Sequence, residues 1–522
     1  MLARCSGAAL MGLEAIPVAV EVDIAPGLPG LLMVGLPDAA VQESRERVRA
    51  ALRNSGLQMP LTRVIVNLAP ADLRKEGPAF DLAIALAVLA ASGQLDPRSL
   101  NGVWCAGELG LDGALRPVRG ALALALAARR AGARALLLPA ANGSEAALVD
   151  ELAIWPATDL RAALHWLQGT GVSAGTATIT PVPKPKPHQE QELQEVDRQL
   201  DLADVRGQPH GRRALEIAAA GGHHLLLVGP PGSGKTMLAQ RLPGLLPPLS
   251  RKEMLELTLL YSVAGLLPAS AAEPGLIQRR PFRSPHHSCS SAALVGGGAQ
   301  PRPGELTLAH HGVLFLDELT EFRRDVLNQL RQPLEQGEIW LSRARQRLRY
   351  PCAIALVAAT NPCPCGWYGD PERACSCGTG LRQRYWSRLS GPLLDRLDLQ
   401  VVLRRLEASD LVPRRTPGAA AAESSRSVAA RVQAARLRMG ARNPGGVNNA
   451  QLLGDALLQQ AELGDPALRL WQAAASQRRL SARAAERVLR VARTIADLDG
   501  STAVEPRAIA EALSYRSFDQ AL

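Results

Sequence analysis

Two stretches of the sequence carry side chains suited to phosphate chemistry. Lys235 and Thr236 close a glycine-rich segment, and Asp317 and Glu318 close the apolar run GVLFLDEL. A lysine can neutralise phosphate oxygens, a hydroxyl and a carboxylate can hold Mg²⁺, and a second carboxylate can polarise an attacking water. These residue types in this order predict hydrolysis of a nucleoside triphosphate.

The glycine-rich segment has the context of a phosphate-binding loop. The spacing Gly229-x-x-x-x-Gly234-Lys235-Thr236 follows an apolar strand at 224–228 and precedes a predicted helix. Backbone N–H groups in such a loop turn inward around phosphate oxygens, and the helix N-terminus adds positive potential. We predict that Lys235 reaches the β- and γ-phosphates and that Thr236 holds Mg²⁺. The predicted ATP-binding loop comprises Gly229, Pro230, Pro231, Gly232, Ser233, Gly234, Lys235 and Thr236.

Two later apolar strands end in polar residues. The strand at 313–316 leads into Asp317 and Glu318, where α/β sheets bind ligands. We expect Asp317 to support Mg²⁺ and Glu318 to orient the attacking water. The strand at 353–359 leads into Asn361, which is placed to hydrogen-bond the γ-phosphate or that water. The alternative for Asn361 is a simple turn residue before Pro362.

Two arginines are candidates for stabilising charge on the leaving γ-phosphoryl group. Arg396 lies in SGPLLDRLDL, and Arg483 lies in the predicted helix RRLSARAAERVL. Arginine is abundant in this chain, so the prediction for Arg396 and Arg483 depends on their position relative to the other motifs.

Four cysteines bracket a short loop that directly follows Asn361. They form the pairs Cys363-x-Cys365 and Cys375-x-Cys377. Four thiolates from two arms can complete a tetrahedral Zn²⁺ site, although these pairs are tighter than the common C-x₂₋₄-C spacing. The alternative is reduced cysteines in a loop whose shape prolines and glycines determine.

Alternating arginines occur in LSRARQRLRY, before the Asn361 strand: Arg343, Arg345, Arg347 and Arg349. Period two on a strand would place all four on one face, where they could follow a nucleic-acid backbone. The alternatives are a solvated strand face and a row of inter-subunit ion pairs. The group Arg279, Arg280 and Arg283 is a second candidate, and we expect a structural or loop role for His286 and His287.

The composition is compatible with a globular protein that binds nucleic acid. The net charge of +10 permits nucleic-acid binding, and 47% hydrophobic with 21% charged residues fits a globular protein. No apolar stretch reaches the 18 residues of a membrane span, and Glu14 interrupts the N-terminal apolar segment, so we expect no membrane association and a cytoplasmic location.

The chain divides by pattern into a mixed N-terminal part, a linker, a central part with the motifs, and a helical end. Strands at 18–24, 62–69 and 134–140 alternate with helices at 39–55 and 81–92. A Gly-, Ser- and Thr-rich then Pro-rich segment begins near Gly169, and a second small-residue stretch covers 416–425. The remainder predicts helices only.

The order of these motifs resembles that of AAA+ ATPases with a helical lid. Longer strings, such as RPFRSPHHSCSSAALVGGG (280–298), NPCPCGWYGD (361–370) and LSARAAERVLRVARTIADLDG (480–500), resemble the YifB/ComM branch of the magnesium-chelatase-like family. The resemblance spans nearly the whole chain. It implies that Arg396 is a finger reaching a neighbour's ATP and Arg483 a lid sensor, with Arg388 the weaker candidate for the finger. A finger in trans implies a closed homo-oligomeric ring, and hexameric rings are expected from the family.

The N-terminal part resembles the Lon-protease-like (S5-like) domain of this family. The strings VEVDIAPGLPG and RKEGPAFDLAIALAVL carry the resemblance. Where proteolytic members have a serine, the turn Gly77-Pro78-Ala79 has alanine, and 117–124 offers no lysine. Without a nucleophile and an amine base, acyl transfer has no route, so we expect an inactive scaffold.

The sequence thus predicts an α/β protein: a Lon-like α+β domain (1–168), a linker (169–195), an AAA+ core with the cysteine cluster (196–410) and a helical lid (425–522). The function favoured is an ATP-hydrolysing ring motor on branched or single-stranded DNA, a helicase or branch-migration factor in recombination or natural transformation, as ComM members imply. Its expected cofactors are ATP, Mg²⁺ and structural Zn²⁺. The alternatives are the ATPase subunit of a metal chelatase and a protein-remodelling ATPase.

Overall fold

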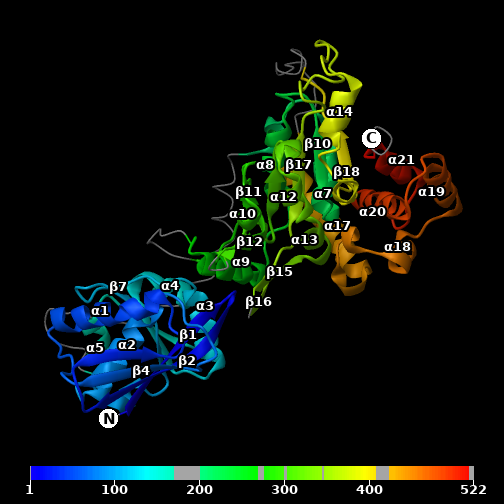
Figure 1. Cartoon of the computed structure of the whole chain (residues 1–522). Helices are drawn as coiled ribbons and strands as arrows, with labels where there is room; N and C mark the ends of the chain where they lie inside the picture. The colour runs from blue at the N-terminus through cyan, green and yellow to red at the C-terminus, as the bar shows by residue number, and fades with distance from the viewer. Residues whose placement is uncertain are drawn as a thin grey trace. The chain divides into compact units, whose positions relative to one another are not determined.

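The computed structural model describes residues 2–169, 200–267, 275–298, 302–343, 346–406 and 423–516. The chain forms two compact units (Figure 1). Unit 1 comprises Met1–Pro187 and Arg251–Ile277, and unit 2 comprises His188–Ser250 and Gln278–Leu522. Most of the predicted linker, most of the stretch 416–425, and Arg345 lie outside the described residues.

Unit 1 is built on a mixed seven-stranded sheet of order β3-β4-β2-β1-β5-β8-β9. The pairs β1–β2 and β2–β4 are antiparallel and the other pairs are parallel. The strands are β1 (Leu2–Met11), β2 (Glu14–Ala25), β3 (Gly30–Val34), β4 (Arg63–Ala69), β5 (Val103–Cys105), β8 (Ala135–Pro139) and β9 (Ala153–Ala157).

The helices of unit 1 include one that is buried on every side. The sequence of α2 (Asp81–Ala91), DLAIALAVLAA, has no polar face, and all its residues are buried, as expected of a core helix. The other long helices are α1 (Ala39–Asn54), α3 (Ala121–Arg130) and α5 (Leu160–Leu167). The predicted strands and helices of this part are confirmed within a few residues. Strand β1 was missed because its small residues, LARCSGAALM, show little alternation.

One helix of unit 1 comes from the middle of the motif-bearing sequence. Helix α9 (Arg251–Ala264) follows α8 (Lys235–Leu245) of unit 2 along the chain, yet it packs on α3. The Ser262 hydroxyl donates a short hydrogen bond to Glu145, and the Ser262 carbonyl accepts from the N–H of Gly120 at 3.1 Å. Leu259 packs against the buried cluster that contains Leu122. Helix α9 is therefore part of the unit 1 core.

Unit 2 is built on a five-stranded sheet of order β11-β14-β17-β10-β18 in which every pairing is parallel. The strands are β10 (Leu225–Val228), β11 (Phe282–Arg283), β14 (Val313–Leu316), β17 (Ala355–Thr360) and β18 (Leu399–Val402). Strands β10 and β14 are buried along their whole length, which explains their continuous apolar runs. Because all five strands run the same way, their carboxyl ends meet at one edge.

The C-terminal part of unit 2 is helical, as predicted (Figure 1, orange to red). It contains α17 (Ser425–Arg442), α18 (Gly454–Ala461), α19 (Asp465–Gln477), α20 (Ala482–Leu498) and α21 (Pro506–Ser514). Within the ranges described, no helix has the length and apolar character needed to cross a bilayer.

Candidate nucleotide site

Three neighbouring strands bring the predicted phosphate-chemistry residues to one edge of the unit 2 sheet. Strand β10 pairs with β17, and β17 pairs with β14. The loop after β10 is fastened to β17, since the N–H of Gly229 donates to the Thr360 carbonyl at 3.2 Å. The glycine-rich loop, Asp317, Glu318 and Asn361 therefore gather where parallel sheets bind ligands.

Lys235 lies at the centre of this group. Its Nζ donates to the carbonyls of Gly229 at 2.7 Å and Pro230 at 3.0 Å, and to Oδ1 of Asn361 at 3.2 Å. Burial lowers the pKa of Lys235, and the nearby carboxylates of Asp317 and Glu318 oppose that shift. All three hydrogen-bond partners are neutral oxygens, so the ammonium charge remains available to phosphate.

The glycine-rich loop has the backbone conformation that phosphate binding requires. Gly232 and Gly234 have φ of 79° and 87°, a region that side chains disfavour. A Cβ at Gly229 would lie 2.7 Å from Oγ of Ser233 and 2.8 Å from the Leu403 carbonyl. Ser233 is fully buried, and its Oγ has no hydrogen-bond partner within the described part of the chain.

The residues expected at Mg²⁺ also lie together. Oγ1 of Thr236 donates to Oδ2 of Asp317 at 3.0 Å. A hydroxyl and a carboxylate side by side are the oxygen ligands that Mg²⁺ accepts alongside nucleotide phosphates. The donor set therefore fits ATP with Mg²⁺, with Thr236 and Asp317 as the protein ligands.

Glu318 has a partner that sequence reasoning missed. Nδ1 of His287 lies 3.2 Å from Oε2 of Glu318, whose side chain is half exposed. Glu318 itself has a left-handed backbone, with φ of 51°. His287 follows β11, and β11 pairs with β14, so the sheet order explains the contact. From the sequence we predict a structural or loop role for His287, because no sequence pattern identifies β11 as the neighbour of β14.

Gln208 is a second residue that the sequence did not indicate. Its Nε2 donates to the Ser233 carbonyl in the phosphate loop at 3.1 Å and to the Arg404 carbonyl. Gln208 immediately precedes helix α7 (Pro209–Gly221) and has φ of 51°. The side chain thus ties the phosphate loop to the segment after β18.

The three candidate arginines lie away from this group. Arg396 pairs with Glu335, and Arg388 pairs with Glu321 at 3.0 Å. Arg483 is exposed on the first turn of α20. No hydrogen bond or ion pair joins any of the three to the phosphate loop among the residues that the structure describes.

A buried polar cluster connects the Arg396 segment to the helical part. Asp398 lies 3.2 Å from Nδ1 of His223 and 3.5 Å from Nε of Arg487 on α20. Nε2 of His223 lies 2.8 Å from Oγ1 of Thr494, also on α20. Burial raises the pKa of Asp398, but the His223 hydrogen bond and the electrostatic attraction of His223, His224 and, last, Arg487 outweigh it and hold that pKa at about 2. The Asp398 side chain is therefore a buried anion between the sheet and α20.

The alternating arginines belong to a hairpin, which corrects the expectation of a single strand. Strands β15 (Glu338–Arg343) and β16 (Gln346–Pro351) are antiparallel, so Arg343 lies on one strand and Arg347 and Arg349 on the other. Arg347 and Arg349 are exposed, whereas Leu348 and Tyr350 are buried, as period two predicts.

An exposed aromatic ring shares the face of these two arginines. The guanidinium of Arg347 lies 4.9 Å and that of Arg349 6.0 Å from the ring centre of Trp340, which is 40% exposed. Trp340 pairs with Arg349 across the hairpin. Arg349 also pairs with Glu338 on the neighbouring strand, and in the second arginine candidate group Arg283 forms a two-point ion pair with Glu305.

The four cysteines Cys363, Cys365, Cys375 and Cys377 come together in the loop after β17. All of their sulfur atoms lie within 4.8 Å of one another.

The unit 1 positions where proteolytic members would have a nucleophile and a base are also described. Ala79 lies in the short turn 78–80 that leads into α2, and Leu122 and Leu124 of α3 are buried.

Comparison with known proteins places these features in a family. The family model described as magnesium chelatase, subunit ChlI, matches residues 201–411. The models for subunit ChlI of Mg-chelatase and for the ChlI C-terminal part match residues 20–142 and 422–516.

Full-length relatives agree with these matches. YifB of Escherichia coli is 45% identical over 516 residues, covering 98% of this chain and 97% of YifB. The competence protein ComM of Haemophilus influenzae is 42% identical over 509 residues, covering 98% of this chain and 96% of ComM. Lon protease 2 of Bacillus subtilis is 31% identical over 159 residues, 29% of this chain and 28% of that protease. The chain belongs to the YifB/ComM family of magnesium-chelatase-like AAA+ ATPases.

Proposed function

We propose that this protein is an ATP-driven ring motor that acts on DNA. Membership of the AAA+ superfamily supports ATPase activity, and one close relative is named a competence protein. The observation that carries the DNA assignment is the exposed face of the β15–β16 hairpin, which combines Trp340 with Arg347 and Arg349.

ATP hydrolysis is assigned to the residues at the sheet edge. Lys235 neutralises the β- and γ-phosphates, and Thr236 with Asp317 holds Mg²⁺. Glu318 orients the attacking water, and Asn361 hydrogen-bonds that water or the γ-phosphate. The contacts between Lys235 and Asn361 and between Thr236 and Asp317 support these roles, because each pair converges on the same end of the phosphate loop.

A homo-oligomeric ring, which we take to be hexameric, completes this site. Arg396 is proposed to act on the ATP of a neighbouring subunit, and Arg483 to act from the lid. Among the residues that the structure describes, no hydrogen bond or ion pair joins either arginine to the phosphate loop, and Arg396 pairs with Glu335. A finger that works in trans fits this placement, and a heterologous interface that closes gives a ring.

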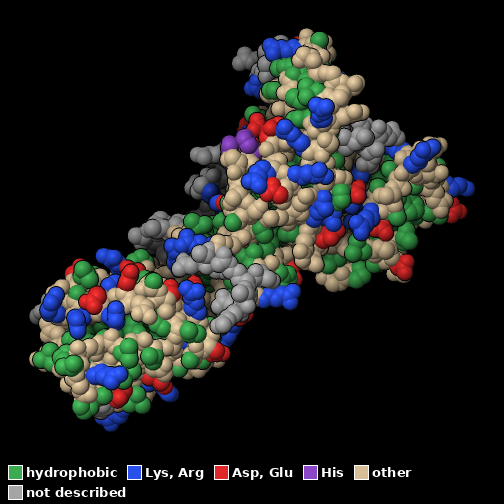
Figure 2. Space-filling model, viewed as in Figure 1, with side chains coloured by type: hydrophobic (Ala, Val, Ile, Leu, Met, Phe, Trp, Pro, Cys, Tyr) green, Lys and Arg blue, Asp and Glu red, His purple; other side chains and the backbone are tan. Residues whose placement is uncertain are grey.

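Guanidinium groups beside an exposed indole are the combination that single-stranded nucleic acid binds, through phosphate contacts and base stacking. On the face drawn in Figure 2, Lys and Arg side chains are interspersed with Asp and Glu. The assignment therefore rests on the local chemistry of the hairpin rather than on the net charge.

The testing experiment measures the steady-state ATPase rate with single-stranded, duplex and branched DNA at two salt concentrations. Stimulation by DNA that weakens with salt is expected, and Glu318→Gln should abolish the rate. The triple variant Trp340→Ala, Arg347→Ala, Arg349→Ala should keep its DNA-free rate and lose the stimulation. Arg323→Ala, which removes an exposed arginine elsewhere in unit 2, is the matched control.

A rate that DNA does not change would overturn the DNA assignment and leave an ATPase that works on protein or on a metal-chelatase partner. Equal DNA affinity and salt dependence in the triple variant and the Arg323→Ala control would remove the hairpin from the proposal.

A further inference from the structure

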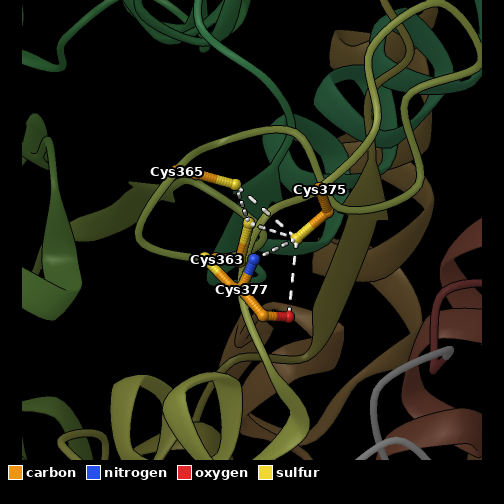
Figure 3. A group of neighbouring side chains, drawn as sticks. All are labelled: Cys363, Cys365, Cys375 and Cys377. Atoms are coloured by element: carbon orange, nitrogen blue, oxygen red, sulfur yellow. Dashed lines mark hydrogen bonds between the residues drawn. The ribbon is translucent and has the colours of Figure 1, made fainter.

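The loop between β17 and α14 (Thr379–Trp386) holds four thiols in a compact group (Figure 3). The sulfur atom of Cys363 lies 3.3 Å from that of Cys365 and 3.6 Å from that of Cys375, and Cys365 and Cys375 are also 3.6 Å apart. These separations are far longer than a disulfide bond of about 2.0 Å. They are close to the edges of about 3.8 Å that a sulfur tetrahedron has when each Zn–S bond is about 2.3 Å.

From this geometry we propose that Cys363, Cys365, Cys375 and Cys377 bind one structural Zn²⁺, and that the loaded loop supports the nucleotide site. The donor set is all sulfur, with no carboxylate or imidazole in the group. Soft thiolates select zinc over Mg²⁺, and four protein ligands leave no open position, as in structural sites.

The surroundings of the sulfur atoms suit anionic ligands. The N–H of Cys377 donates to the sulfur of Cys375 at 3.4 Å, and the N–H groups of Trp367 and Ser376 donate to the sulfur of Cys365. Such second contacts orient the ligands of a metal site and offset their charge. Cys363 is fully buried and Cys377 nearly so, whereas Cys365 and Cys375 are partly exposed.

The same loop touches the nucleotide site at two points. Asn361, which accepts from Nζ of Lys235, lies two residues before Cys363. Gly366 has φ of 84°, and a Cβ there would lie only 2.9 Å from Cδ of Pro231 in the phosphate loop. A metal that closes the loop therefore fixes the Asn361 side of the site and the backbone that abuts Pro231. This second half of the inference rests on the proposed ATPase function, whereas the metal site does not.

The first experiment is metal analysis of the full chain, purified without chelators or metal-affinity resin. We expect about one zinc ion per chain in the wild type and in Cys5→Ala, and none in Cys375→Ser, Cys377→Ser. Gel filtration and circular dichroism check that the double variant folds. Zinc far below one ion per chain, or iron in its place, would overturn the metal site.

The second experiment separates the metal from its effect on ATP. Treatment of the wild type with 1,10-phenanthroline should remove zinc and lower the ATPase rate about tenfold, and the non-chelating 1,7 isomer should do neither. Gly366→Ala keeps all four thiols, so it should retain zinc yet bind a fluorescent ATP analogue more weakly. An unchanged rate and unchanged nucleotide affinity after zinc loss would overturn the coupling alone, while zinc in a chain without ATPase activity would overturn the proposed function alone.

Discussion

Nδ1 of His287 lies 3.2 Å from Oε2 of Glu318, and the two residues come from the ends of adjacent strands β11 and β14. Glu318 has a left-handed backbone and a half-exposed side chain, and within the described ranges His287 is the one side chain at ion-pair distance from its carboxylate. The imidazole is therefore the group that sets where the proposed water-orienting carboxylate lies.

Replacing His287 should slow catalysis without weakening nucleotide binding. In His287→Ala the carboxylate loses its restraint, and misplacement of a catalytic group by about 1 Å can cost up to about 100-fold in rate. We expect kcat to fall about 10- to 100-fold with KM for ATP unchanged. His287→Gln, which keeps an N–H donor, should recover part of the rate.

His286 provides the matched control for that test. Its Nδ1 lies 2.8 Å from Oγ of Ser288, and its ring neighbours that of His287. If His286→Ala lowers kcat as much as His287→Ala, the effect belongs to the loop as a whole and the role of His287 is wrong.

Removing the Gln208 side chain should weaken ATP binding. Its amide donates to two backbone carbonyls, one of them in the phosphate loop, and each such bond contributes about 1 kcal/mol. We therefore expect Gln208→Ala to raise the Kd of a fluorescent ATP analogue about fivefold, by the usual relation of free energy to affinity. The exposed Gln383 on α14 supplies the control, and equal Kd values for Gln208→Ala and Gln383→Ala would contradict the prediction.

Neutralising Asp398 should destabilise unit 2 in a pH-dependent way. Removal of one partner from a buried charge cluster costs about 3 kcal/mol, since it leaves the buried Arg487 with only the half-exposed Asp395 carboxylate, 3.6 Å from its Nη1, as an anionic partner. The folded pKa of Asp398, about 2, lies below its ordinary value of 3.8. The stabilisation by its charge is therefore complete above pH 4 and is lost as the pH falls toward 2.

Urea unfolding followed by circular dichroism checks both parts of this expectation. The difference in the free energy of unfolding between the wild type and Asp398→Asn should be constant from pH 7 to 5 and should shrink below about pH 4. Asp325→Asn, at an exposed ion pair, should leave the unfolding curve unchanged at every pH. A difference for Asp398→Asn that does not depend on pH would show that its charge is not what stabilises the cluster.

Ser262→Ala should loosen the attachment of α9 to unit 1. The change removes the donor to Glu145, whose buried carboxyl then keeps only the N–H of Leu122 and the amide of Asn142. Loss of one such hydrogen bond costs about 1 kcal/mol, so amide hydrogen exchange in 251–264 should accelerate. Ser514→Ala, at an exposed serine of α21, is the control, and equal protection of α9 in both variants would count against this contact.

The residues that could be predicted from the sequence are those whose signal is local. A strand, a glycine-rich loop and Lys235 stand together in the chain, and Asp317, Glu318 and Asn361 each end an apolar run. Strands that are buried on both faces of a parallel sheet are continuous apolar runs, and such runs can be recognised in the sequence.

The residues that could not be predicted depend on which elements become neighbours. His287 matters because β11 lies beside β14, and Trp340 because the pairing of β15 with β16 places it opposite Arg349. Gln208 acts through backbone carbonyls, which have no sequence signature. Long-range contacts place α9 in unit 1, and the sequence of α9 itself contains no local pattern that predicts this.

The contribution of 251–277 to unit 1 determines which proteolytic or recombinant fragments of this protein contain a whole unit. The chain passes between the two units at three places in its sequence, near 187, 250 and 277. Proteolytic cleavage within 188–199 would therefore give two polypeptides with no covalent link, and the N-terminal product would stay associated with α9 of the other product only through non-covalent packing within unit 1. A recombinant fragment that stops before that region would lack Leu259 and Ser262, and would expose the apolar surface around Leu122 together with the Glu145 carboxyl group, which would have lost one of its three donors. To isolate unit 1 in a soluble form, α9 would have to be joined to it by a designed connection.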